Sequence, residues 1–186
     1  MVHDNYFVIT GAMGSGKSTV LNALNLLGIK TIQEPARQIL AEQRSIEGEG
    51  VYDKNKQLFC DLMLSRSLFQ YRSLQPHPSI IIFDRGIPDN IAYADLFGLN
   101  AVAAQNAAQN YRYNKHLFFF PGWKDIYQTD DERTMTYSQA NAFGESVKHI
   151  YQTLGYEIIT IPLVSPQKRA QFLIGSVLEI SGFGIA

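Results

Sequence analysis

Short apolar runs recur along the chain and predict five β-strands, at residues 6–10, 30–33, 79–84, 116–120 and 157–161. Most of these runs are continuously apolar, without alternation of apolar and polar positions. That pattern is typical of strands covered on both faces of a parallel sheet. We therefore expect a parallel five-stranded sheet with helices on both sides.

Segments with helical periodicity separate the strands, at residues 17–27, 35–45, 53–74, 88–97, 101–111, 138–153 and 166–180. Gly28 and Gly155 fit the ends of two helices, because glycine readily takes the left-handed conformation that ends a helix. Right-handed crossovers between parallel strands give an α/β fold of three layers, with ligands at the carboxyl ends of the strands. We expect residues 1–186 to form a single domain.

Composition and charge narrow the class of protein. With 186 residues, a formal net charge of -1 and 18% charged residues, the chain fits a soluble globular protein without a general attraction to nucleic acid or anionic membranes. No segment is apolar for long enough to span a bilayer, and the first residues do not resemble a secretion signal. Cys60, the single cysteine, lies among apolar residues at helical spacing, which indicates a buried thiol and a cytoplasmic location.

Residues 11–18, GAMGSGKS, match the pattern G-x-x-x-x-G-K-[ST] of a phosphate-binding loop, or P-loop. The motif directly follows the first predicted strand and precedes an amphipathic helix, which is the context it requires. The glycines let backbone N–H groups converge on phosphate, and the helix adds its positive end. The expected nucleotide-binding residues are Gly11, Met13, Gly14, Ser15, Gly16, Lys17, Ser18 and Thr19.

The cofactors expected at this loop are ATP, or another nucleoside triphosphate, and Mg²⁺. Lys17 is expected to reach the β- and γ-phosphates, and Ser18 to supply a hydroxyl ligand to Mg²⁺. Asp84 ends the third predicted strand, where a carboxylate holds Mg²⁺ or orients the nucleophile, unless it caps the following helix. Ser18 and Asp84 are therefore the candidate metal ligands.

The residue after Asp84 bears on the choice between transfer and hydrolysis. ATPases that activate water commonly have a glutamate there, whereas this chain has Arg85, which stabilises a phosphoryl group in transfer, holds an anionic acceptor, or forms a surface salt bridge. The pair favours transfer to a bound hydroxyl or phosphate. A GTPase is disfavoured, because the run most similar to the motif N-K-x-D, at residues 114–117, precedes its strand and ends in leucine.

Two residues after the second strand are candidates for binding the phosphoryl acceptor. Glu34 could take a proton from an acceptor hydroxyl, or it could simply precede the helix that Pro35 starts. Arg37, one turn later, is either an acceptor ligand or a surface charge. Arg66 falls in an apolar stripe of the predicted helix 53–74, so its charge is expected to face inward, toward an acidic neighbour or the acceptor's phosphate.

Three further residues complete the predicted acceptor-binding set. Asp89 could cap the helix at residues 88–97 or hydrogen-bond a sugar hydroxyl, and Tyr93 lies on the same helix. Trp123, just past the fourth strand, could stack on a base, line the acceptor pocket or belong to the core.

Residues 121–137 show no sustained periodicity and mix charges, which suggests a lid. In a phosphotransferase such a segment excludes water and delivers a cation to the transferring phosphoryl group. Arg133 is the candidate cation. The alternative is a solvated charged loop that leads into the next helix.

The chain resembles the P-loop family that joins the kinase half of NadR, a nicotinamide riboside kinase, with the TRPL translocation defect protein, a family labelled as AAA-type ATPases. The likeness spans residues 6–162 and rests on GAMGSGKS, EPAR, IFDRGIPDNIAY and YNKHLFFFPGWKDIYQTDDER. It implies a P-loop NTPase fold of the nucleoside- or nucleotide-kinase type. On this likeness Lys17, Ser18 and Asp84 would serve ATP and Mg²⁺, and Arg85 and Arg133 the phosphates.

Two functions follow as hypotheses. The first is an ATP- and Mg²⁺-dependent small-molecule kinase acting on a nucleoside-like or related acceptor, with Lys17, Glu34, Asp84, Arg85 and Arg133 as catalytic residues. The alternative is a nucleotide-switched binding protein or slow ATPase without a small-molecule acceptor.

Overall fold

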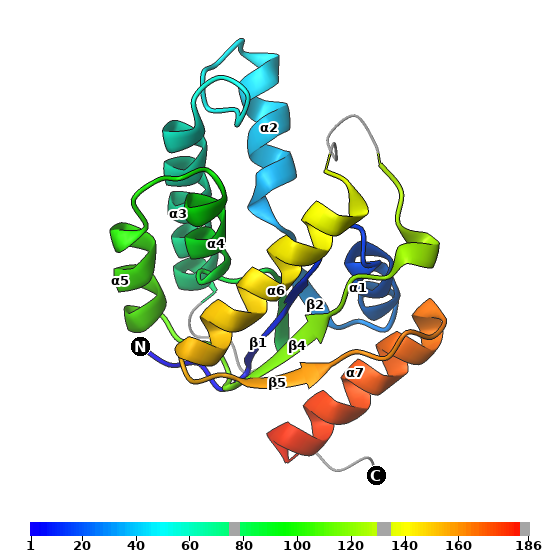
Figure 1. The fold of residues 1–186 in the computed structure, drawn as a ribbon. Coiled ribbons are helices and arrows are strands. Elements are labelled where there is room, and N and C mark those ends of the chain that lie inside the picture. The colour runs from blue at the N-terminus through cyan, green and yellow to red at the C-terminus, as the bar shows by residue number, and fades with distance from the viewer. Residues whose placement is uncertain (75–78, 130–134, 183–186) are drawn as a thin grey trace.

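The computed structural model describes residues 1–74, 79–129 and 135–182 (Figure 1). This part of the chain contains the strands β1 (Tyr6–Gly11), β2 (Lys30–Ile32), β3 (Ile81–Asp84), β4 (His116–Phe120) and β5 (Glu157–Thr160). Its helices are α1 (Lys17–Leu26), α2 (Pro35–Ser45), α3 (Lys56–Ser73), α4 (Asp89–Leu96), α5 (Val102–Asn110), α6 (Tyr137–Thr153), α7 (Pro166–Ser181) and the short 3-10 helix η1 (Lys124–Ile126). Each predicted strand and helix is present, with ends shifted by a few residues.

The strands form one parallel sheet in the order β2-β3-β1-β4-β5, which confirms the predicted α/β fold. β1 lies at the centre, between β3 and β4. The strand order reverses beside β1, and such a point leaves a crevice at the carboxyl ends of the strands, where ligands bind. Ile9 of β1 pairs with Asp84 of β3, so the P-loop and Asp84 meet at this crevice.

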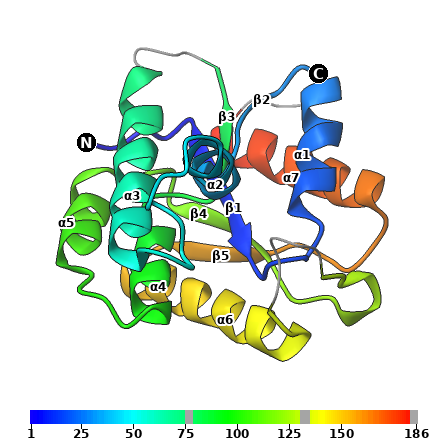
Figure 2. The same cartoon turned by 90° about the horizontal axis from the view of Figure 1, so that it is seen from above.

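Alternate side chains of β1 point to opposite faces of the sheet and contribute to two separate cores. Phe7 and Ile9 pack with residues of α1 and α7, whereas Tyr6 and Val8 pack with residues of α3, α4 and α6. Figures 1 and 2 show the sheet between these two groups of helices. The predicted three layers are thereby confirmed, and burial on both faces explains why the strands are continuously apolar.

Local sequence explains several helix ends. Asn55 accepts a hydrogen bond from the Leu58 N–H at 3.0 Å, so α3 begins at Lys56 rather than at residue 53. Gly28 and Gly155 have positive φ values of 78° and 83°, as their prediction as helix stops requires.

Two predictions about the sequence concern a buried thiol and the length of the apolar segments. Cys60 in α3 is buried, and burial raises the pKa of its thiol to about 11. This environment is that of an unreactive structural thiol. In residues 1–74, 79–129 and 135–182, no helix combines the length and apolar character that crossing a membrane requires.

Candidate active site

The P-loop connects β1 to α1 through a backbone that glycine alone accommodates at two points. Gly11 has φ of 134°, and a Cβ there would lie 2.1 Å from the carbonyl oxygen of Phe120 on β4. Gly16 has φ of 82° and immediately precedes α1. The loop therefore presents its backbone at the positive end of α1, where phosphate is favoured.

Lys17 begins α1 and is a buried cation. Its Nζ donates to the carbonyl oxygen of Ala12 at 2.8 Å. Burial and the nearby charge of Arg85 lower the pKa of Lys17 to about 8, against the opposing effect of Asp84 and Glu34. A polyphosphate placed beside this ammonium would stabilise its charged form, so Lys17 is electrostatically suited to bind phosphate.

Asp84 is buried at the end of β3, and its Oδ1 has no hydrogen-bond partner. Burial and the negative charge of Glu34 raise the pKa of this carboxyl to about 6. α4 begins only at Asp89, so Asp84 does not cap that helix.

An unpartnered buried carboxylate oxygen is a group that a metal ion satisfies, and Ser18 borders the same cavity as Asp84. In the described residues, no three or more His, Cys, Asp or Glu side chains are grouped so that they could hold a metal ion by themselves. The protein would thus contribute few ligands, and phosphate and water oxygens would supply the others, as is usual for Mg²⁺. Ser18 and Asp84 fit this ion.

Arg85 is buried, and its φ of 64° is uncommon for a residue other than glycine. Its Nε donates to Glu34 Oε1 at 2.7 Å, and its Nη1 donates to Asp89 Oδ1 at 2.9 Å. Nη1 also lies 3.3 Å from the Thr10 hydroxyl and from the Gly11 carbonyl oxygen. Arg85 is therefore a buried ion-pair partner, and the surface salt bridge is excluded.

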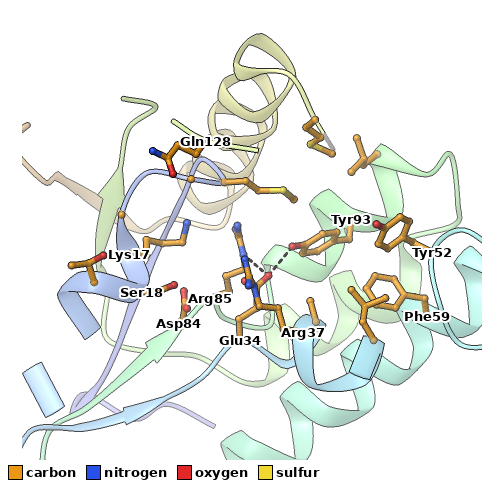
Figure 3. Close-up of a pocket in the computed structure, with 18 of the residues that line it drawn as sticks. Lys17, Ser18, Glu34, Arg37, Tyr52, Phe59, Asp84, Arg85, Tyr93 and Gln128 are labelled. Atoms are coloured by element: carbon orange, nitrogen blue, oxygen red, sulfur yellow. Dashed lines mark hydrogen bonds and ion pairs between the residues drawn. The ribbon is translucent and has the colours of Figure 1, made fainter. Parts of the chain in front are cut away.

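Glu34 directly precedes α2, but its side chain does not cap that helix. Oε1 instead accepts hydrogen bonds from Arg85 Nε and from the Tyr93 hydroxyl, both at 2.7 Å (Figure 3). Burial opposes ionisation of Glu34, but the charges of Arg85 and Lys17 and the bond from Tyr93 outweigh it and lower the pKa of Glu34. Glu34 is thus an ionised carboxylate with a fixed orientation.

Asp89 is not available to a sugar hydroxyl, contrary to that part of its prediction. Its carboxylate is buried and accepts hydrogen bonds from Thr10, Arg85, the Gly86 N–H and Tyr151. With four donors, the oxygens have no capacity left for a ligand. The bond from Gly86 N–H holds the start of α4, and the others tie β1, β3 and α6 together behind the site.

Arg66 does not face the interior, so that expectation was wrong. Its guanidinium makes two bonds with Glu42 of α2, at 3.2 and 2.8 Å, and its side chain is 32% exposed. The buried positions of α3 include Phe59, Met63 and Tyr71, which lie on one face of the helix because they are separated by four and eight residues. Arg66 is turned away from that row. Of the two anions considered for it, the acidic neighbour is the one present, as Glu42.

Trp123 lies apart from the residues that line the acceptor side. Its ring packs on the guanidinium of Arg169 in α7, 5.3 Å from ring centroid to Cζ. This contact lies behind the P-loop, because the same arginine donates to the Ser15 carbonyl oxygen. Trp123 therefore does not line the acceptor pocket, whereas its stacking on a base stays a prediction.

One cavity of about 380 Å³ contains both halves of the predicted site. Its phosphate end is formed by Met13, Gly14, Gly16, Lys17, Ser18 and Thr19. Gly11 and Ser15 lie behind this surface, with the Ser15 hydroxyl bonded to the Ala12 carbonyl oxygen at 2.7 Å. The loop thus lines the cavity through six of its eight predicted residues.

Opposite the phosphate end, the cavity wall is apolar and largely aromatic. It is formed by Ala36, Leu40, Tyr52, Phe59, Leu96 and Phe97. Glu34, Arg37 and Arg85 lie between the two ends, as Figure 3 shows. The sequence pattern does not reveal this wall, because its members come from α2, α3, the end of α4 with the residue after it, and the segment before α3.

The predicted lid contributes Ile126, Gln128 and Met135 to the rim of the cavity. Arg133 lies outside the described residues. Residues 124–126 form η1, and α6 begins at Tyr137 after a capping box formed by Thr136 and Gln139.

Comparison with known protein families assigns the sequence to one of them. A family model described as AAA domain matches residues 6–169. No curated protein matches the sequence.

The structure is similar in fold to several solved kinases. The NadR protein, solved in complex with NR, has a TM-score of 0.67 and 15% identity over 97% of this chain, which spans 52% of the NadR chain. Deoxyadenosine kinase from M. mycoides has a TM-score of 0.65 and 14% identity, over 94% of this chain and 99% of that one. Thymidylate kinase from Candida albicans has a TM-score of 0.64 and 18% identity, over 96% of this chain and 92% of that one.

These likenesses confirm the fold expected from the resemblance to the NadR kinase half, whereas the link to the TRPL protein stays a prediction. The chain spans about half the length of NadR, so NadR's activities are not transferred to it. The model match covers most of the chain, from the first strand to the first turn of α7. The chain belongs to the AAA domain family and has the fold of P-loop nucleoside and nucleotide kinases.

Proposed function

We propose that this protein is an ATP- and Mg²⁺-dependent kinase that transfers a phosphoryl group to a hydroxyl of a nucleoside-like molecule. The observation that carries the proposal is the position of Glu34. It is an ionised carboxylate, held by Arg85 and Tyr93, in the same cavity as Lys17 of the P-loop. A hydrolase requires no such second half.

The donor half would hold the triphosphate of ATP. Gly16 and Lys17 present a backbone N–H group and an ammonium to the β- and γ-phosphates. Ser18 and Asp84 would hold Mg²⁺, directly or through water. When bound, this ion neutralises charge on the phosphate oxygens.

In the acceptor half, Glu34 would act as general base. The acceptor oxygen forms a bond to the γ-phosphorus while the bond from that phosphorus to the β-γ bridging oxygen breaks, and ADP leaves. Glu34 takes the hydroxyl proton. Arg85 and Tyr93 keep Glu34 oriented, and the guanidinium lies near the path of the transferred group.

The pairing of Arg85 within the protein favours a neutral acceptor over a nucleoside monophosphate. Arg85 already pairs with two carboxylates, Glu34 and Asp89, so its charge is compensated within the protein. The wall opposite the phosphate end contains the aromatic side chains of Tyr52, Phe59 and Phe97. Such a wall suits the ring of a base, with a sugar hydroxyl directed toward Glu34.

The test is ADP release from Mg-ATP, measured against a panel of nucleosides and the matching nucleoside monophosphates. We expect nucleosides, and not monophosphates, to raise the rate above the ATP-only background. Lys17→Ala is the inactive control. If ATP binds but no acceptor raises the rate, the kinase proposal fails, and a nucleotide-switched binding protein or slow ATPase becomes the better reading.

A further inference from the structure

Arg169, in the first turn of α7, is a buried cation that neither the P-loop motif nor the proposed chemistry includes. The residue is 1% exposed. Arg169 lies on the apolar face of α7, in line with Leu173 and Val177. An arginine at a core position is rare, because a buried charge is costly unless other groups compensate it.

Its compensation is incomplete within the described residues. No carboxylate among them pairs with Arg169, and its buried Nε has no hydrogen-bond partner. The guanidinium packs between the rings of Phe120 and Trp123, with Cζ 4.9 and 5.3 Å from their centroids. Burial lowers the pKa of Arg169 from its usual value, although an arginine stays charged. Within residues 1–74, 79–129 and 135–182, this positive charge is therefore held without a paired anion.

The guanidinium is attached to the P-loop backbone. Nη2 donates to the carbonyl oxygen of Ser15 at 2.6 Å. Nη1 is so close to the loop that a Cβ on Gly16 would lie 2.7 Å from it. Arg169 thus touches both residues of the Ser15–Gly16 peptide.

In a trans peptide the C=O and the following N–H point in opposite directions. A carbonyl fixed toward Arg169 therefore turns the Gly16 N–H away from Arg169. Gly16 lines the cavity, while Arg169 lies behind the loop. The bond consequently aims one donor of the loop at the phosphate end.

We propose that Arg169 is a positioning residue for polyphosphate: it fixes the Ser15–Gly16 peptide in its phosphate-binding orientation and places a buried positive charge behind it. The missing anion is then the nucleotide's own phosphate. This inference rests on the proposed donor half of the site but needs neither an acceptor nor phosphoryl transfer.

The test measures binding of inorganic tripolyphosphate and of ATP, each with Mg²⁺, by calorimetry. Arg169→Met keeps an unbranched side chain and removes the charge and the donors. Because no carboxylate among the described residues pairs with Arg169, its removal leaves no unpaired buried charge among them, and the melting temperature should stay near that of the wild type. Loss of a charged hydrogen bond should raise both Kd values about tenfold or more.

The matched control is Lys168→Met, which removes a charge from the neighbouring, exposed position of the same helix. We expect this variant to bind both ligands as the wild type does. A folded Arg169→Met protein with wild-type affinity for tripolyphosphate would overturn the inference. Absence of kinase activity in the wild type would instead count against the proposed function alone.

A second pair of variants covers the case in which Arg169→Met does not fold. Trp123→Ala removes one of the two rings that hold the guanidinium, and Trp123→Phe keeps a ring there. We expect Trp123→Ala to raise the Kd for tripolyphosphate about two- to fivefold, and Trp123→Phe to stay near wild type. Equal affinity in Trp123→Ala and the wild type would contradict the role of Arg169.

Discussion

Among single residues, Glu34 is the proposed general base. Arg85 and Tyr93 fix its carboxylate with two bonds of 2.7 Å, and its lowered pKa keeps it ionised at neutral pH. A carboxylate with a lowered pKa is a weak base, so its contribution depends on geometry. Arg85, in its left-handed conformation, supplies that geometry.

Glu34→Gln should lower kcat by roughly 10²–10⁴-fold, because the amide does not accept the acceptor's proton. The Kd for ATP should stay within about twofold, since the phosphate end of the cavity is untouched. Steady-state kinetics and calorimetry measure the two quantities. Tyr93→Phe, which keeps the carboxylate and removes only one bond to it, is the milder control. An unchanged kcat in Glu34→Gln would rule out the base.

Cys60 offers a pH-dependent test at the same scale. Its thiol has a pKa raised to about 11, so below that pH the reactive thiolate is scarce in the folded protein. We expect Cys60 to react with a thiol reagent at pH 8 far more slowly in the native protein than in denaturant, and faster as the pH approaches 11. Rapid labelling of the native protein at pH 8 would show that the thiol is accessible.

At the scale of elements, α6 supports the P-loop from the side opposite α1. Gly144 lets the helix approach the loop closely, because a Cβ there would lie 2.7 Å from Ala12 N and 2.9 Å from Ala12 Cα. α6 also supplies Tyr151, which donates to Asp89 behind Arg85. The donor loop and the ion-pair network thus share one supporting helix.

Gly144→Ala should therefore push α6 from the loop, lower the free energy of unfolding by about 1–3 kcal/mol and weaken ATP binding. Gly175→Ala is the matched control, since a Cβ at that helical glycine meets nothing within 4 Å. This control should be neutral or more stable by about 0.5–1 kcal/mol. Denaturant unfolding and ATP titration measure both effects, and equal behaviour of the two variants would refute the close packing.

For the whole molecule, the cavity is lined by residues of several elements that are far apart in sequence. The P-loop and Asp84 lie at the carboxyl ends of β1 and β3, while the aromatic wall belongs to the helices that cover one face of the sheet. A ligand in the cavity therefore contacts several elements at once. Binding should stabilise the fold as a unit.

Mg-ATP at about 100 times its Kd should add about 2.7 kcal/mol to the free energy of unfolding. For a chain of this size that corresponds to a rise in melting temperature of roughly 5–10 °C. Thermal unfolding with and without nucleotide measures the shift. Lys17→Ala should show little or none, and a wild-type protein without any shift would argue against nucleotide binding.

The sequence by itself determined the strands, the helices, the layered fold and the P-loop. Each of these depends on residues that are neighbours along the chain: continuous apolar runs, helical periodicity, and the spacing of Gly11, Gly16 and Lys17. For Arg85 and Glu34, the sequence indicated only that each follows a strand at the same edge of the sheet, and not that they pair. Their hydrogen bond depends on how β2 and β3 lie together.

The tertiary structure alone decided which side chains face the ligand. The carboxylate of Asp89 accepts hydrogen bonds from Thr10 and Tyr151, which are 79 and 62 residues away in sequence. Arg66 misses the core because one position along a helix turns a side chain by about 100°. Arg169 had a sequence signal, a charge in the apolar row with Leu173 and Val177, but its partner Ser15 is 154 residues away. Local pattern sets where elements begin and end, and packing between distant elements sets what each side chain does.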